Sequence, residues 1–246
     1  MPQSNRSARF VAWANAVALG LASPDLAAAE ITAADPPHQV DGLPGGDGQT
    51  LPVVLSRLAA AGAGAQLALP VPGDVAGVPG PGPLTTAALT AGEAVLVAGW
   101  GLVPDVDAVR VRWIAYLCEA VSAGLPGLSD ADHGLAEALR EATQLLDRLD
   151  VSRWDDRDAD DLAALRSGRL DGDGLAPGYP ERAVSVLVRA RRLRTIVRLA
   201  SRDDGAAVTA REAALRLAAL KPLDRAARHA EMAAYNALAE VRPADR

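Results

Sequence analysis

Four arginines near the end of the chain have the spacing of a single helical face. Arg191, Arg194, Arg198 and Arg202 follow one another at intervals of three, four and four residues, which places them on the same side of an α-helix. Guanidinium groups bind phosphates and carboxylates through planar, bidentate contacts. The row is therefore a candidate partner-binding face, but the near balance of positive and negative charges in this half of the chain favours the alternative. The alternative is that it pairs with the acidic run at 155–161 inside a helical bundle, or faces water.

A second group of polar residues surrounds the most distinctive segment of the chain. Pro70 to Pro83 contains five prolines and four glycines in fourteen residues, so it predicts a loop that neither a helix nor a central strand can contain. Such loops carry function when a rigid scaffold holds them, and otherwise serve as stiff connectors. The candidate ligand-binding residues in or near this loop are Asp74, Thr85, Thr86 and Glu93.

The acidic run itself resembles a cation site only in part. Asp156, Asp158 and Asp160 match the first three ligand positions of a calcium-binding EF-hand loop, and Asp171 and Asp173 follow. The match then fails, because Asp161 replaces the required glycine and Ser167 replaces the closing glutamate. The run is expected to be a solvated acidic loop, and the sequence predicts no metal site.

Signatures of catalysis or cofactor binding are missing from the sequence. Cys118 with a distant histidine is a possible nucleophilic pair, but a lone cysteine after the apolar run 114–117 is more typical of a small buried hydrophobe. His38, His133 and His229 show no metal-ligand spacing. The glycine patterns lack the residues that nucleotide-binding loops require. We therefore predict no cofactor, and the sequence leaves open whether the chain is an enzyme.

Charge and composition restrict the classes of partner. The chain of 246 residues has a formal net charge of -6, which disfavours nucleic acids and anionic membranes, since their binders usually display a basic surface. A loose helix-turn-helix pattern at 209–238, split at Pro222 and carrying Arg225, Arg228 and His229, does not outweigh that argument. Homo-oligomerisation or a protein partner is the expected form of interaction.

The N-terminal segment has two interpretations. Arg6 and Arg9 precede the apolar residues 10–22, an outline that signal peptides share. Against this, Asn15 interrupts the run, and Phe10, Trp13, Ala14, Val17 and Leu21 recur at helical spacing. We expect a packed helix and a cytoplasmic protein, which a single cysteine also fits; the alternative is a secreted protein whose residues 1–22 are removed.

The first half predicts helices alternating with strands. Helices are expected at 7–21, after the capping Ser23, at 51–61 and at 84–90, with strands at 38–43, 66–69, 94–98 and 109–113. The second half predicts helices only, at 129–149, 158–166, 180–201 and 209–220, with a bend at Pro222 and a last helix to about 241. The fold class is α+β: a mixed α/β domain over 1–124 and an antiparallel helical bundle over 125–246.

Three short blocks of sequence carry a family resemblance. They are residues 10–15 (FVAWAN), 69–74 (LPVPGD) and 91–95 (AGEAV). In these blocks the chain resembles a group of uncharacterised actinobacterial proteins without an established activity. The resemblance implies no function and no site residues.

Taken together, these patterns favour a non-enzymatic protein whose helical half supports oligomerisation or partner binding. The alternative is an enzyme or small-molecule binder with a pocket beside the Pro70–Pro83 loop, because ligand sites favour domain junctions.

Overall fold

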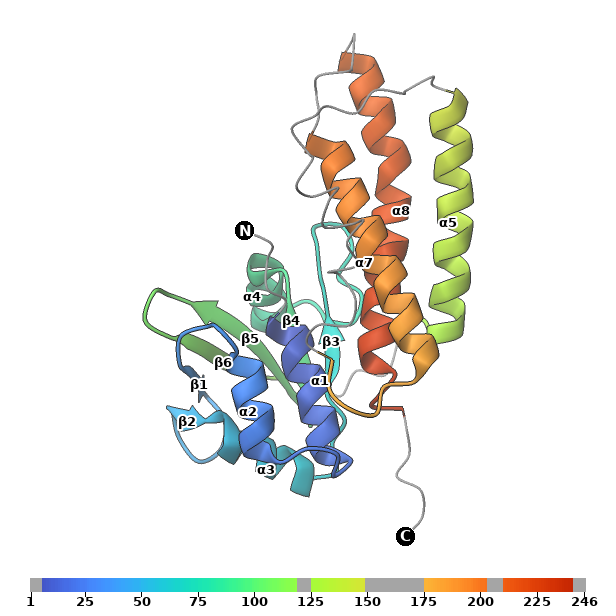
Figure 1. Cartoon of the computed structure of the whole chain (residues 1–246). Helices are drawn as coiled ribbons and strands as arrows, with labels where there is room; N and C mark the ends of the chain where they lie inside the picture. The colour runs from blue at the N-terminus through green and yellow to red at the C-terminus, as the bar shows by residue number, and fades with distance from the viewer. Residues whose placement is uncertain (1–5, 119–124, 149–174, 203–209, 241–246) are drawn as a thin grey trace. The chain divides into compact units, whose positions relative to one another are not determined.

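The protein consists of two compact units, seen here in a computed structural model (Figure 1). The structure describes residues 6–118, 125–148, 175–202 and 210–240. Unit 1 contains the described residues up to 125 together with 175–180 and 235–240, and unit 2 contains those of 126–148, 181–202 and 210–234. Unit 1 holds the sheet, whereas the described part of unit 2 is helical. The α+β fold class is therefore confirmed.

Unit 1 is built on a mixed sheet of six strands in the order β2-β1-β6-β5-β4-β3. Neighbouring strands are antiparallel except for β1 and β6, which pair in parallel with His38 opposite Val111. The strands are β1 (His38–Asp41), β2 (Gln49–Thr50), β3 (Gln66–Ala68), β4 (Ala94–Val97), β5 (Trp100–Val106) and β6 (Val111–Leu117).

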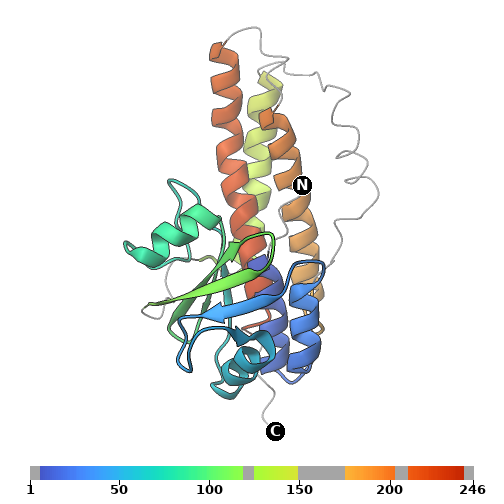
Figure 2. The same ribbon diagram turned by 90° about the vertical axis from the view of Figure 1, so that its left-hand side faces the viewer.

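Helices cover both faces of this sheet, which gives unit 1 three layers (Figure 2). One face is covered by α1 (Arg6–Ala18), α2 (Pro24–Thr32) and α3 (Leu51–Ala60), and the other by α4 (Pro83–Ala91). As expected, Ser23 caps α2 by accepting the amide of Leu26 at 3.2 Å. The predicted apolar face of α1 is buried except for Leu21, which is 45% exposed and lies beyond the end of the helix.

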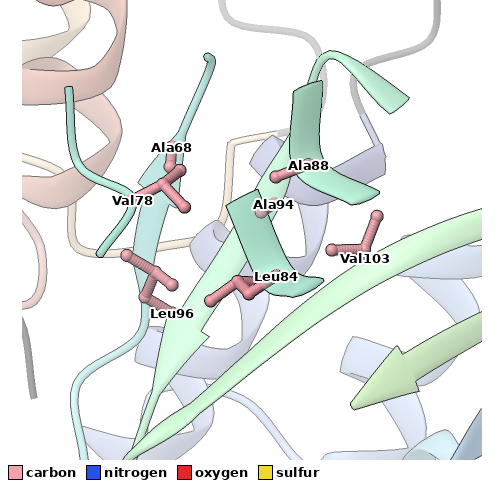
Figure 3. Packing of buried hydrophobic residues seen from close by; sticks show 7 residues of the cluster. All are labelled: Ala68, Val78, Leu84, Ala88, Ala94, Leu96 and Val103. Atoms are coloured by element: carbon pink, nitrogen blue, oxygen red, sulfur yellow. The ribbon is translucent and has the colours of Figure 1, made fainter. Parts of the chain in front are cut away.

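Alternation along the strands sends side chains into two separate cores. On the α1 face, the Phe10 ring contacts the fully buried ring of Trp113, with centroids 5.0 Å apart. On the α4 face, Leu84 approaches Gly101 so closely that an added Cβ would lie 2.4 Å from its Cδ1. A larger residue at position 101 would therefore require the side chain of Leu84 to move. The buried cluster around Leu84 also contains Ala68, Val78, Ala88, Ala94, Leu96 and Val103 (Figure 3).

Strand β5 has no counterpart among the predicted elements, because Gly101 and Pro104 both argue against a central strand. The register explains why Pro104 is tolerated. Val95 lies opposite Leu102, so the partner of Pro104 across β4 would be residue 93, which precedes the strand, and the missing N–H removes no bond. The strand expected at 109–113 is displaced to β6, and Val109, which is 76% exposed, lies in the preceding turn.

The described part of unit 2 comprises three helices: α5 (Leu128–Arg148), α7 (Glu181–Arg202) and α8 (Ala210–Asn236). The two helices predicted on either side of Pro222 are a single helix, since α8 continues through this proline. Burial of Leu220 and Leu223 on either side offsets the cost of a proline in a helix interior, which is about 3 kcal/mol. Because α8 is continuous here, the turn of the helix-turn-helix suggested at 209–238 is absent.

Candidate functional site

The four residues predicted to bind a ligand near the Pro70–Pro83 loop do not converge. Asp74 accepts the amide of Ala76 at 3.2 Å within its own turn. Thr85 donates its hydroxyl to the carbonyl of Pro79 at 2.7 Å, and Thr86 donates to that of Gly82 at 3.3 Å. These three side chains hold the loop and the first turn of α4 in place.

Glu93, the fourth of them, lies across the sheet from that loop and serves helix α1. Its Oε2 accepts the backbone amide of Ser7 at 2.7 Å, which satisfies a donor that the helix start leaves without a partner. Burial raises the pKa of Glu93, although the Ser7 hydrogen bonds and the charges of Arg6 and Arg9 work in the opposite direction. A carboxylate at a helix N-terminus is a stabilising arrangement, so Glu93 acts as a long-range cap.

Beside Glu93 lies a compact ionic cluster. Asp35 receives a bidentate contact from Arg6, at 3.0 Å from Nε and 2.8 Å from Nη2, and a further contact of 2.5 Å from Arg9. Burial raises the pKa of Asp35, but the hydrogen bonds and charges of Arg6 and Arg9 outweigh burial and leave it lowered. The cluster thereby ties α1 to the segment that follows α2.

His38 is the buried histidine of this cluster. Its Nδ1 accepts the indole N–H of Trp113 at 3.3 Å, so the ring proton belongs on Nε2, which lies 3.6 Å from Asp35 Oδ2. Burial lowers the pKa of His38 to about 4; the carboxylate of Asp35 opposes this shift, and the charges of Arg9 and Arg6 add to it. His38 is therefore neutral at pH 7, and its side chain is fully buried. This geometry serves packing rather than access for a substrate.

Two asparagines satisfy the open edge of the sheet. Asn15 donates to the carbonyl of Ala65 at 2.9 Å and accepts its amide at 2.7 Å. Asn236 makes the same pair of bonds with Leu67, at 3.3 Å and 2.7 Å. The backbone N–H and C=O groups of residues 65 and 67 point away from β4. The two amide side chains therefore make the hydrogen bonds that a further strand at this edge would make. We call these contacts the asparagine clasp.

Half of the predicted arginine face lies against a buried acid. Glu231 of α8, which is 4% exposed, forms ion pairs with Arg194 and, at 3.6 Å, with Arg191. Burial disfavours the charged form of Arg194, but the attraction of Glu231 outweighs burial and raises the pKa of Arg194. Arg198 is exposed, and the side chain of Arg202, like the acidic run at 155–161, lies outside the described residues. In the described part, Glu231 is thus the partner that joins the row to α8.

A hollow in unit 2 brings residues of α5 together with residues of α8, some of which the sequence grouped only as part of the suggested helix-turn-helix. It has a volume of about 480 Å³ and lies between the first turns of α5 and the middle of α8. Lys221, Arg225 and His229 line it from α8, and Asp130 lines it from α5. Its remaining lining is small or apolar: Pro126, Ala131, Gly134, Pro222 and Ala226. We call it the α5–α8 pocket.

Family models match nearly the whole chain. The model described as "Rv1486c-like protein, N-terminal domain" matches residues 7–127, and the one described as "Rv1486c-like protein, C-terminal domain" matches residues 129–232. The chain belongs to the Rv1486c-like family. This confirms the resemblance that short blocks of the sequence carry to a family without an established activity. No curated protein and no solved structure matches the chain.

The match to the Rv1486c-like C-terminal domain includes all but one of the residues that line the α5–α8 pocket. Two signals in the sequence point there: the helix-turn-helix pattern that includes Arg225 and His229, and Lys221, the single lysine among 25 lysine and arginine residues. Neither is a recognisable ligand-binding motif. Elsewhere, Cys118 packs against the cluster around Leu84, and burial raises the pKa of its thiol. Within the described residues, no group of three or more acidic, histidine or cysteine side chains is placed to hold a metal ion. Nor is any described helix long and apolar enough to cross a membrane.

Proposed function

We propose that the chain is a non-enzymatic, cytoplasmic binding module whose helical unit recognises its partner through the α5–α8 pocket. The observation that carries this proposal is the pocket itself, about 480 Å³ in volume and lined by Lys221, Arg225 and His229. Volumes of 300 to 1,000 Å³, roughly, are typical of ligand sites, as is a largely apolar lining with a few polar groups.

The pocket is a better candidate than the Pro70–Pro83 segment. Asp74, Thr85 and Glu93 each form hydrogen bonds that hold a turn or a helix end. The pocket is different because it offers volume: basic side chains of α8 and small residues of α5 line a hollow that a ligand can fill. A cytoplasmic location is part of the proposal because the single Cys118 cannot form an internal disulfide.

Filling the pocket tests this function. Gly134 lines the pocket, and an added Cβ there would meet no atom within 4 Å. Gly134→Phe therefore fills the space, and replacing a glycine inside a helix does not weaken the helix. Gly134→Ala is the matched control, since one methyl group leaves most of the volume open.

Native mass spectrometry of the full-length protein from its own cells provides the measurement. We expect a bound species on the wild type and on Gly134→Ala that is missing from Gly134→Phe. Light scattering on the same samples shows whether that species is a second copy of the chain. The proposal fails if the three proteins carry the same species, or if none carries any.

A further inference from the structure

The basic residues of the α5–α8 pocket form a regular stripe. Lys221, Arg225 and His229 follow one another at intervals of four on α8, and residues so spaced are neighbours on one helix face. Like charges at this spacing destabilise a helix. An anion bound against the stripe would attract each of these side chains and so offset their mutual repulsion.

Residues on both helices make room for such an anion. Ala226 on α8 and Ala131 and Gly134 on α5 line the same pocket, and the position of a Cβ on Gly134 is open space. The carboxylate of Asp130 offsets one of the two permanent positive charges, Lys221 and Arg225. Among these three charged lining residues the cationic groups outnumber the anionic one, which suits an anionic ligand.

The two permanent cations offer complementary chemistry. A lysine ammonium is a compact point charge, and an arginine guanidinium is a planar fork that holds two oxygens at once. Both groups bind phosphates and carboxylates. A volume of about 480 Å³ is larger than an inorganic ion needs, so it leaves space for an organic part of the ligand, which the apolar residues of the lining can contact.

We propose that the α5–α8 pocket binds a small organic oxyanion, a phosphate monoester or a carboxylate, whose charged group lies between Lys221 and Arg225. This inference rests on the proposed function, because it names the chemical class of the ligand in the same pocket. His229 borders the same anion from the next turn of α8.

Titration of the isotope-labelled full-length protein tests the assignment. The probes are inorganic phosphate, glycerol 3-phosphate and succinate, followed through the backbone amide shifts of residues 130–134 and 221–229. Sodium chloride at matched ionic strength shows which shifts are due to screening alone. We expect saturable shifts with the organic probes and weaker binding of inorganic phosphate. Tighter binding of glycerol 3-phosphate identifies a phosphate ester as the ligand class, and tighter binding of succinate identifies a carboxylate.

Paired charge variants separate a site from general electrostatics. Lys221→Gln with Arg225→Gln should weaken binding by about a hundredfold, roughly tenfold for each charged contact. The control, Arg140→Gln with Arg198→Gln, removes the same charge from exposed arginines that do not line the pocket. It should leave binding unchanged, and Lys221→Arg, which keeps the charge, should retain most of it. Circular dichroism checks that each variant is folded.

Two results would overturn the assignment: no saturable shift with any probe, or equal weakening in both double variants. If this happens while Gly134→Phe still loses its bound species, the ligand is not an oxyanion and the pocket remains a binding site. If Gly134→Phe also behaves like the wild type, the pocket has no binding role.

Discussion

The two units use buried polar side chains in different ways. In unit 1, Asn15, Glu93 and Asn236 each form hydrogen bonds with backbone groups of segments that are distant in sequence. Their polar groups therefore stabilise the fold. In unit 2, Glu231 likewise joins two helices, but Lys221 and Arg225 border a hollow. The comparison shows that a polar residue type is a poor guide to function until its surroundings are known.

A division of roles follows from this difference. Under the proposed function, unit 1 is a scaffold in which hydrogen-bonded polar groups hold a three-layer core, and unit 2 combines a similar internal ion pair with the proposed binding pocket. If the division is correct, polar substitutions in unit 1 should change stability and leave ligand binding unaffected. The largest effect should come from the asparagine clasp.

Replacing Asn15 with alanine should destabilise unit 1 by about 4 kcal/mol, because the amide and the carbonyl of Ala65 would both lose their partner in a buried position. The free energy of unfolding in urea measures this change. Thr90→Ala, which removes an exposed hydroxyl bond within α4, is the control and should change stability by less than about 0.5 kcal/mol. A loss as small as that of the control would show that the clasp has no structural role.

Local signals in the sequence were sufficient for most elements of unit 1. The cap at Ser23, the proline and glycine breaks and the apolar periodicity predicted α1 to α4 with boundaries within a few residues. Strand β5 was missed because Gly101 and Pro104 are tolerated only through tertiary details, the approach of Leu84 and the end of β4. At Pro222 the sequence predicted a helix end that the structure does not have. Proline usually ends a helix, but burial of the flanking leucines favours a continuous α8 here.

The candidate sites were much harder to predict from the sequence. Asn15 and Ala65 are 50 residues apart, and Leu67 and Asn236 are 169 apart, so the clasp leaves no local pattern. Closeness in sequence groups Glu93 with the Pro70–Pro83 loop, whereas its hydrogen-bond partner is Ser7, which lies 86 residues earlier in the chain. The pocket combines Asp130 with Lys221, and only the packing of α5 beside α8 brings these together.

The second largest effect concerns His38 and pH. Since folding lowers the pKa of His38 from 6.5 to about 4, the unfolded chain takes up a proton below pH 6.5 that the folded protein does not. The stabilisation is therefore complete above pH 6.5 and is lost as the pH falls towards 4, by about 3 kcal/mol in total. Unfolding free energies measured in urea between pH 7 and pH 4 should show this slope.

His38→Gln keeps an acceptor for the indole N–H of Trp113 and removes the titrating group. The difference in unfolding free energy between wild type and variant therefore separates the titration of His38 from that of Asp35 and Glu93. The slope should be absent from the variant. It should persist in His133→Gln, which alters a histidine whose side chain is 72% exposed. Identical slopes for wild type and His38→Gln would mean that another group controls the acid response of unit 1.

The smallest effect should come from the ion pairs of Glu231, where unit 2 most resembles unit 1. Glu231→Gln removes the buried anion that Arg191 and Arg194 contact, and we expect a loss of about 2 kcal/mol. This is less than for a fully buried pair, because the Arg194 side chain is 35% exposed. Arg198→Gln, in the same row but exposed, should cost less than about 0.5 kcal/mol. A double variant, Glu231→Gln with Arg194→Gln, should lose less than the sum of the single changes, since the two side chains contact each other. If Glu231→Gln instead abolished binding in the α5–α8 pocket while unfolding remained unchanged, the acid would belong to recognition rather than to the scaffold.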